Sequence, residues 1–241
     1  MSSIGNNNLI SQLEEVDKSF TGLWANSTTL KCGTFFFNPD LLNDIFFDKI
    51  TSITCISDEM IDDALALFAK HGTIPYFYTL NYPELEEKLI KKNFRPYDIQ
   101  HVFTKIPDLS KTSKVRKISS DDSMLWSKTF CDAYDCHDWI TPVDGIVKKS
   151  ISSIEYYVDD SISSCVALYE KNSTLGLYCL GTIPGMRKKG LANSLIDFAL
   201  NEVKKRNLEL LMLETYQKDG LIDFYLKLGF KEIYQKNIYT I

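Results

Sequence analysis

Residues 175–206 combine a strand, a cationic turn and a long helix, an order that constrains the fold more than any other feature of the sequence. The apolar run LGLYCLGTIP (175–184) is typical of a strand, and Pro184 ends strand pairing because it has no amide hydrogen. Gly190 precedes a helix predicted over residues 191–206, whose apolar residues recur every three or four positions. The free N–H groups of its first turn, at the positive end of the helix dipole, predict a binding site for a diphosphate. Three consecutive cations strengthen that prediction: Arg187, Lys188 and Lys189.

The chain contains a weak internal repeat. Thr79 aligns with Thr215 and Phe94 with Phe230, and both halves read as strand, helix, strand, short helix, strand. This alternation predicts an α/β fold built on a mixed sheet. The segment PDLSKTSK (107–114) is a predicted joint, which divides the chain into modules at 1–112 and 113–241. The first module lacks the cationic glycine turn, so we expect it to be a degenerate copy.

Composition excludes several classes of function. The net charge is −5, which offers little surface for nucleic acid. No apolar stretch approaches the ~18 residues that a membrane span needs, and the first residues lack the apolar core of a signal peptide. Six cysteines without Cys-x-x-Cys spacing are expected to be reduced thiols of a cytoplasmic protein. Cys131, Cys136 and His137 match no familiar zinc pattern, so we expect no metal.

Two motifs resemble the GCN5-related N-acetyltransferases (GNAT family). Residues 187–192, RKKGLA, are similar to the family's [QR]-x-x-G-x-[GA] signature, and 224–230, FYLKLGF, to its F-Y-x-K-x-G-F segment. The resemblance covers residues 114–241 and implies the GNAT fold in two tandem modules, of which the second is functional. It implies an N-acetyltransferase that uses acetyl-CoA and transfers the acetyl group directly to a primary amine of a small molecule or peptide.

The resemblance also implies roles for individual residues. The turn would bind the pyrophosphate of coenzyme A, and the preceding strand edge would pair with the pantetheine arm and polarise the thioester carbonyl. Tyr225 aligns with the family's general acid, whereas Lys218 stands where many relatives have an asparagine that contacts the coenzyme. The cofactor-binding residues implied in this way are Leu180, Gly181, Thr182, Arg187, Lys188, Lys189, Gly190, Leu191, Ala192 and Asn193.

The general base and the acceptor are less sharply predicted. Glu214, near the end of a strand, is one candidate base. Asp132, Tyr134 and Asp135 lie in the loop expected to bind the acceptor. The carboxylates of Asp132, Asp135 and Asp138 are further candidates to relay a proton through water, and their clustering favours a cationic amine. An acyl-CoA sensor without turnover is the alternative function. Aminoacyl transfer from tRNA is a weaker alternative because the chain is acidic. A homodimer is one assembly that the sequence leaves open.

Overall fold

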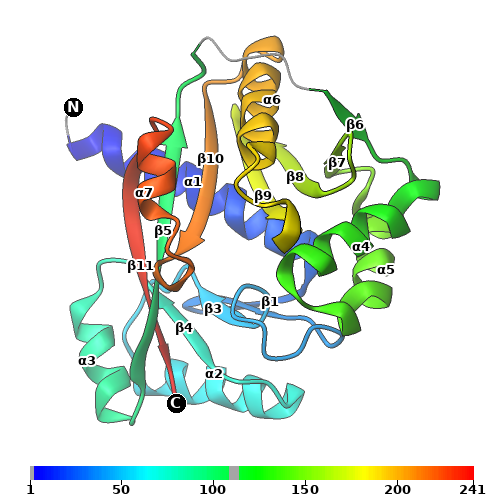
Figure 1. The fold of residues 1–241 in the computed structure, drawn as a ribbon. Coiled ribbons are helices and arrows are strands. Elements are labelled where there is room, and N and C mark those ends of the chain that lie inside the picture. The colour runs from blue at the N-terminus through cyan, green and yellow to red at the C-terminus, as the bar shows by residue number, and fades with distance from the viewer. Residues whose placement is uncertain (1–2, 109–113) are drawn as a thin grey trace. The chain divides into compact units, whose positions relative to one another are not determined.

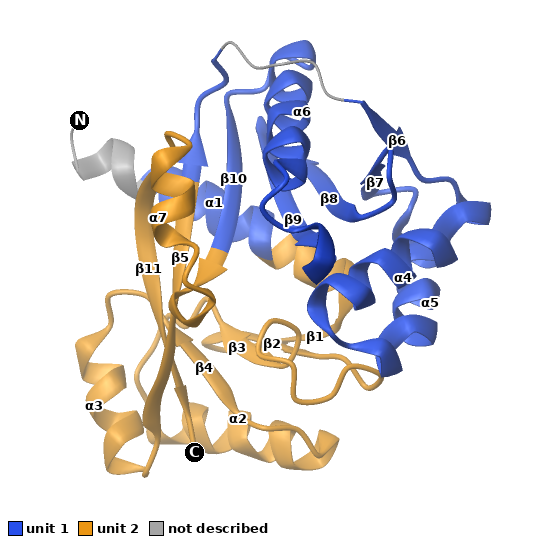
Figure 2. Cartoon of the chain, in the orientation of Figure 1, with its two compact units in different colours: residues 1–17, 104–214 blue, residues 18–103, 215–241 orange. Residues whose placement is uncertain are grey.

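The computed structural model describes residues 3–108 and 114–241. The chain divides into two compact units, each built from segments that are distant in the sequence (Figures 1 and 2). Unit 1 contains residues 1–17 and 104–214, and unit 2 contains residues 18–103 and 215–241. The boundaries between the units fall within helix α1 (Ser3–Trp24), strand β5 (Arg95–Lys105) and strand β10 (Leu210–Tyr216).

Unit 1 contains a mixed set of strands in the order β10-β9-β8-β7-β6. Strand β10 is parallel to β9, whereas β9-β8, β8-β7 and β7-β6 are antiparallel pairs. Helices α4 and α6 both pack against β8 and β9, and Trp126 of α4 is fully buried among aromatic rings. The other helices and strands of unit 1 are β6 (Val115–Lys117), α4 (Ser123–Tyr134), α5 (Ile140–Ser150), β7 (Glu155–Asp159), β8 (Ser164–Lys171), β9 (Thr174–Thr182) and α6 (Leu191–Lys205).

Unit 2 has strands in the order β1-β2-β3-β4-β11-β5. Local signals define its helices: the Ser57 side chain caps α2 by accepting the N–H of Met60, and Gly72 ends α2 in the left-handed conformation. The core of unit 2 includes the buried rings of Phe68 and Phe77. The other helices and strands of unit 2 are β1 (Asn26–Leu30), β2 (Gly33–Phe37), β3 (Lys49–Thr51), α2 (Asp58–His71), β4 (Tyr76–Thr79), α3 (Pro83–Lys91), α7 (Ile222–Lys227) and β11 (Lys231–Thr240).

The order of elements follows the repeat, but the compact units do not coincide with the two expected modules. Elements α2-β4-α3-β5 recur as α6-β10-α7-β11. Strand β11, the last of the second series, pairs antiparallel with β4 of the first, with Ile238 opposite Tyr78. Residues 215–241 therefore belong to the same unit as residues 18–103. The module boundary expected at residue 112 lies outside the described residues and stays a prediction about the repeat.

Two cysteines correct the expectation that all six thiols are reduced. Cys32 and Cys55 form a disulfide. Strand pairing brings the two residues together, because β2 is antiparallel to β3 and the N–H of Thr54 donates to the Cys32 carbonyl at 3.1 Å. The other four cysteines, Cys131, Cys136, Cys165 and Cys179, are thiols. Among the described helices, none combines the length and apolar character required to cross a bilayer.

Candidate functional site

Strand β9 carries a bulge just before the glycine turn. Ala167 pairs with Tyr178 and Cys165 with Gly181, so Val166 of β8 lies opposite two residues of β9. A β-bulge of this kind bends the strand that contains it. One of the two bulged residues, Cys179, has φ +53°, a left-handed conformation that side chains rarely adopt inside a strand. The bulge changes the direction of residues 180–182, which are the predicted partners of the pantetheine arm.

Just before the bulge, β9 loses its parallel partner. The register of β9 with β10 extends from Thr174–Leu210 to Leu177–Leu213, although both strands continue further. Glu214, the candidate base, follows immediately after the last residue of this register and is half-buried. The end of β9 and Glu214 therefore lie where two parallel strands stop pairing, a position at which α/β sheets commonly bind ligands.

The glycine turn is open. Gly190 has φ +83° and begins α6 without a side-chain cap, and residues 187–190 are exposed. A Cβ built on Gly190 would have no atom within 4 Å. In the part of the chain that the structure describes, none of the main-chain N–H groups of residues 188–193 donates a hydrogen bond within the protein. The turn therefore presents donors, exposed cations and free space, which fit the oxygens of a diphosphate.

Arg187 contributes to this turn in a different way from the one expected. Its Nε donates to the Thr182 carbonyl at 3.0 Å, and its Nη2 donates to the Ala133 carbonyl at 2.9 Å. Its own N–H donates to the Pro184 carbonyl at 3.3 Å. The side chain thus ties the turn to the end of β9 and to the end of α4. Arg187 therefore positions the turn in this structure, and phosphate contacts by residues 187–193 stay a prediction.

Side-chain hydroxyls also donate hydrogen bonds to the carbonyl oxygens along the end of β9. The Tyr134 hydroxyl donates to the Leu180 carbonyl at 3.1 Å, and the Ser164 hydroxyl donates to the Gly181 carbonyl at 2.7 Å. Gly181 admits this arrangement because a Cβ there would lie 2.7 Å from the Ala133 Cβ and 2.9 Å from a ring carbon of Tyr134. The end of α4 is thus in close contact with the strand end. The roles of Ala133 and Ser164 carried no signal in the sequence.

Asp132 and Tyr134 were expected in a loop, but both lie in the last turn of α4, and the charged cluster is formed by the end of this helix and the residues that follow it. The imidazole of His137 lies between two carboxylates, with Nδ1 3.3 Å from Asp132 and Nε2 3.6 Å from Asp135. Cys136 lies beside Cys131, because its N–H donates to the Cys131 carbonyl at 3.0 Å. Among the described residues, no three His, Cys, Asp or Glu side chains are arranged to hold a metal ion. Asp132 and Asp135 thus lie beside His137, and their predicted role in binding a cationic acceptor stays a prediction.

Tyr225 and Lys218 belong to unit 2, so their placement relative to the glycine turn stays a prediction. Tyr225 is buried against the ring of Phe103, and burial raises the pKa of its phenol well above the usual range. The phenol therefore stays protonated and is a weaker acid than an exposed tyrosine. The ammonium of Lys218 lies 3.3 Å from the centre of the Tyr97 ring, so this lysine interacts with the protein itself.

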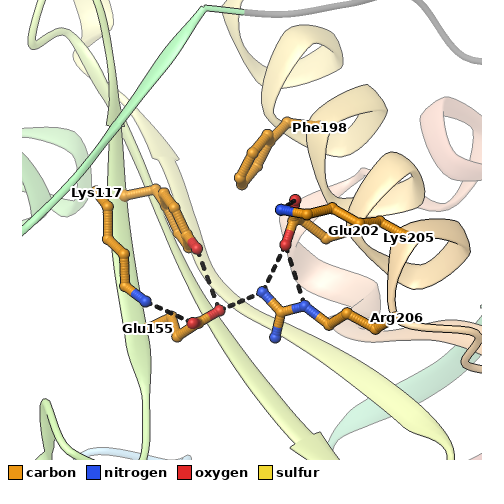
Figure 3. Close-up of a pocket in the computed structure, with 7 residues that line it drawn as sticks. Lys117, Glu155, Phe198, Glu202, Lys205 and Arg206 are labelled. Carbon is orange, nitrogen blue, oxygen red and sulfur yellow. Dashed lines mark hydrogen bonds and ion pairs between the residues drawn. The ribbon is translucent and has the colours of Figure 1, made fainter.

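A cavity of about 530 Å³ lies at the other end of α6 (Figure 3). Arg206 Nη2 lies 2.5 Å from Glu155 Oε2 and 2.7 Å from Glu202 Oε2, and Lys117 lies 2.5 Å from Glu155 Oε1. Figure 3 shows these side chains pointing toward one another below the ring of Phe198. Because both of its carboxylates are paired with cations, we interpret this cavity as a structural ion-pair network that fixes the end of α6.

Comparison with known proteins agrees with this geometry. Residues 116–230 match the model of the acetyltransferase (GNAT) family. A comparison with curated proteins gives no match. Two solved GCN5-related N-acetyltransferases share 12% identity with the chain. The one from Kribbella flavida has a TM-score of 0.67 over 95% of each chain, and the one from Sphaerobacter thermophilus has 0.61 over 97% of this chain and 90% of that chain.

A tandem GNAT protein from the clavulanic acid biosynthesis pathway is also similar, with 10% identity and a TM-score of 0.59 over 87% of this chain and 78% of that chain. At these identities the solved structures show the fold alone. They confirm the fold that the two motifs implied, including its occurrence in tandem. The chain therefore has the fold of the GCN5-related N-acetyltransferases, and its residues 116–230 match the model of the acetyltransferase (GNAT) family.

Proposed function

We propose that the protein is an acetyl-CoA-dependent N-acetyltransferase that acts on a primary amine of a small molecule or peptide. The observation that carries the proposal is the open glycine turn, where the N–H groups of residues 188–193 donate to no described residue and there is free space beside Gly190. Lys188, Lys189 and the N–H groups up to Asn193 would bind the diphosphate of the coenzyme. The thioester would lie along residues 180–182, at the end of β9.

The chain's own residues would then move protons around a direct transfer. Asp132 and Asp135 would bind the cationic acceptor, and Glu214 would accept its proton through water so that a neutral amine attacks the thioester carbonyl. Donors at the strand end would stabilise the charge that develops on the carbonyl oxygen. Tyr225, whose burial keeps the phenol protonated, would donate a proton to the departing sulfur.

Calorimetry with acetyl-CoA tests this proposal. In Gly190→Val the new side chain enters the space assigned to the diphosphate, and we expect affinity to fall about tenfold or more. Gly185→Ala is the matched control, because Gly185 is an exposed glycine of the same turn, with ordinary φ and no atom within 4 Å of a built Cβ. Equal affinity of wild type and Gly190→Val, or no binding by wild type, would exclude the function.

Two further features bear on this proposal. The strongly raised pKa of Tyr225 also suits an acyl-CoA sensor, because it opposes the use of this phenol in proton transfer. A screen of amines that follows release of free thiol separates the two functions. A cytoplasmic location stays a prediction, and the Cys32–Cys55 disulfide argues against it because disulfides persist mainly in oxidising compartments.

A further inference from the structure

A side chain of the protein itself, Tyr134, lies against residues 180–182 of β9, the strand edge that is predicted to pair with the pantetheine arm. The Tyr134 hydroxyl donates to the Leu180 carbonyl at 3.1 Å, and a ring carbon of Tyr134 lies 2.9 Å from the Cβ position of Gly181. Both positions lie in the segment that would pair with the pantetheine arm. A carbonyl that accepts from a phenol competes with any amide of a ligand that approaches from the same side. Tyr134 therefore lies where part of the coenzyme is expected.

We propose that Tyr134 gates this edge: its hydroxyl occupies the Leu180 carbonyl in the free protein and leaves it when the pantetheine amide pairs there. The inference rests on the proposed function, since it concerns how the same site admits acyl-CoA. The proposed gate gives Tyr134 a role in the binding of acyl-CoA, in addition to its predicted role in binding the acceptor.

The surroundings of Tyr134 allow this motion without a change in the fold. The side chain is 50% exposed, and Tyr134 is the last residue of α4, followed by Asp135 in the left-handed conformation. The preceding main chain is fixed, because Arg187 holds the Ala133 carbonyl at 2.9 Å. The Tyr134 ring also packs against Phe130, with the ring centroids 4.7 Å apart, so the phenol exchanges this contact for solvent when it rotates about its own side-chain bonds while the backbone remains in place.

The gate predicts a gain of affinity when the competing hydroxyl is removed. Tyr134→Phe keeps the ring and deletes the hydrogen bond to Leu180, so the variant no longer has to break that bond when the ligand binds. A hydrogen bond of ordinary net strength corresponds to roughly 2- to 10-fold in affinity. We expect the dissociation constant for acetyl-CoA to fall by this factor. The constant for 3′-phospho-ADP, the nucleotide half of coenzyme A without pantetheine, should not change.

Calorimetry of both variants with both ligands decides the matter. Tyr169→Phe removes a hydroxyl from the neighbouring strand β8 and serves as the control, with both constants unchanged. The gate is wrong if Tyr134→Phe binds acetyl-CoA as tightly as wild type or more weakly, or if both ligands change by the same factor. If wild type binds acetyl-CoA and Gly190→Val does not, then a Tyr134→Phe result of this kind excludes the gate but leaves the proposed function standing. If wild type binds neither ligand, the proposed function fails together with the gate.

Discussion

Two glycines of the candidate site are needed for different physical reasons. Gly190 has φ +83°, which a side chain would strain, and the space around it is empty. Gly181 lies in an ordinary strand conformation, but the end of α4 approaches it so closely that a Cβ would overlap Ala133. The first glycine keeps the turn open for a ligand, and the second allows Tyr134 to reach the Leu180 carbonyl.

At the residue scale, Tyr225→Phe tests proton donation. A positioned general acid contributes roughly 10²- to 10⁴-fold to the rate, so we expect kcat to fall by at least about 100-fold. The affinity for acetyl-CoA should change less than twofold, because the ring and its packing against Phe103 are kept. Steady-state release of free thiol, with an acceptor found in the amine screen, measures the first quantity, and calorimetry measures the second.

The control for this variant is Tyr239→Phe, a buried phenol of strand β11 whose hydroxyl donates to Glu86 at 3.1 Å. It should retain wild-type kcat. A Tyr225→Phe variant with undiminished kcat would show that another group protonates the leaving sulfur.

Sequence reasoning could locate the glycine turn but could not foresee how some of its side chains would be used. A glycine that follows a strand and a run of cations and precedes a helix is a local sequence pattern, and the turn at Gly190 was predicted from this pattern. The side chain of Arg187 was expected at the ligand because cations favour anions, yet it binds the carbonyls of Thr182 and Ala133. Ala133 lies far away in the sequence, and its carbonyl is brought close only by tertiary packing.

At the scale of elements, the two ends of helix α6 differ: the first is open and the last is fixed by ion pairs. Its first turn follows the open glycine, and its end is fixed by Arg206, which binds Glu202 of the same helix and Glu155 of β7 (Figure 3). Burial by itself raises the pKa of Glu155, but hydrogen bonds from Lys117 and Arg206 outweigh it, and the pKa lies below its usual range. The same balance, with Arg206 and Lys205, lowers the pKa of Glu202.

Arg206→Met should therefore destabilise the protein in a pH-dependent way. We expect the free energy of unfolding at pH 7 to fall by about 1–3 kcal/mol, because two partly buried carboxylates lose a hydrogen-bonding cation. As the pH falls, the unfolded chain binds protons at these carboxylates before the folded chain does, so their stabilising contribution is lost. The difference between wild type and variant should be present above about pH 4.5 and shrink toward pH 3.

Urea unfolding at several pH values measures this difference. Lys205→Met is the control, since Lys205 is a neighbouring cation whose side chain is 75% exposed, and its loss should have little effect. A difference between wild type and Arg206→Met that is independent of pH would show that packing, and not charge, fixes this end of α6.

Elements with strong local patterns were predictable, and those formed by distant partners were not. Helix α6, with its apolar stripe, was expected at 191–206 and lies at Leu191–Lys205. The hairpin of β1 and β2 was not recognised, since exposed residues dominate β1. The bulge of β9 was also missed, because one extra residue leaves no periodicity in a buried apolar run.

At the scale of the whole molecule, the compact units differ from the modules inferred from the repeat. The order of elements follows the repeat, yet β11 pairs with β4, so each unit combines segments from both halves of the chain. A repeat in sequence specifies similar elements, but it does not specify which copy supplies the partner of each strand. Pairing between distant strands is set by the assembled sheet, and a single sequence does not reveal it.

The Cys32–Cys55 disulfide should stabilise unit 2. It closes a loop with a sequence separation of 23 residues, for which the loss of unfolded-chain entropy corresponds to about 3 kcal/mol. We expect a thiol reductant to lower the urea midpoint of wild type. The double variant Cys32→Ser/Cys55→Ser should have the lower midpoint already and should not respond to the reductant. Equal midpoints of wild type with and without reductant would show that the bond contributes no stability.

The placement of β11 in unit 2 has a consequence for biosynthesis. The order β4-β11-β5 puts residues 231–240 between two strands that the ribosome releases much earlier. Synthesis at about 5–20 residues per second leaves β4 and β5 without this neighbour for roughly 7–30 seconds. The nascent chain must therefore keep two incomplete strand edges from aggregating until translation has passed residue 240, which makes this region a natural substrate for chaperones.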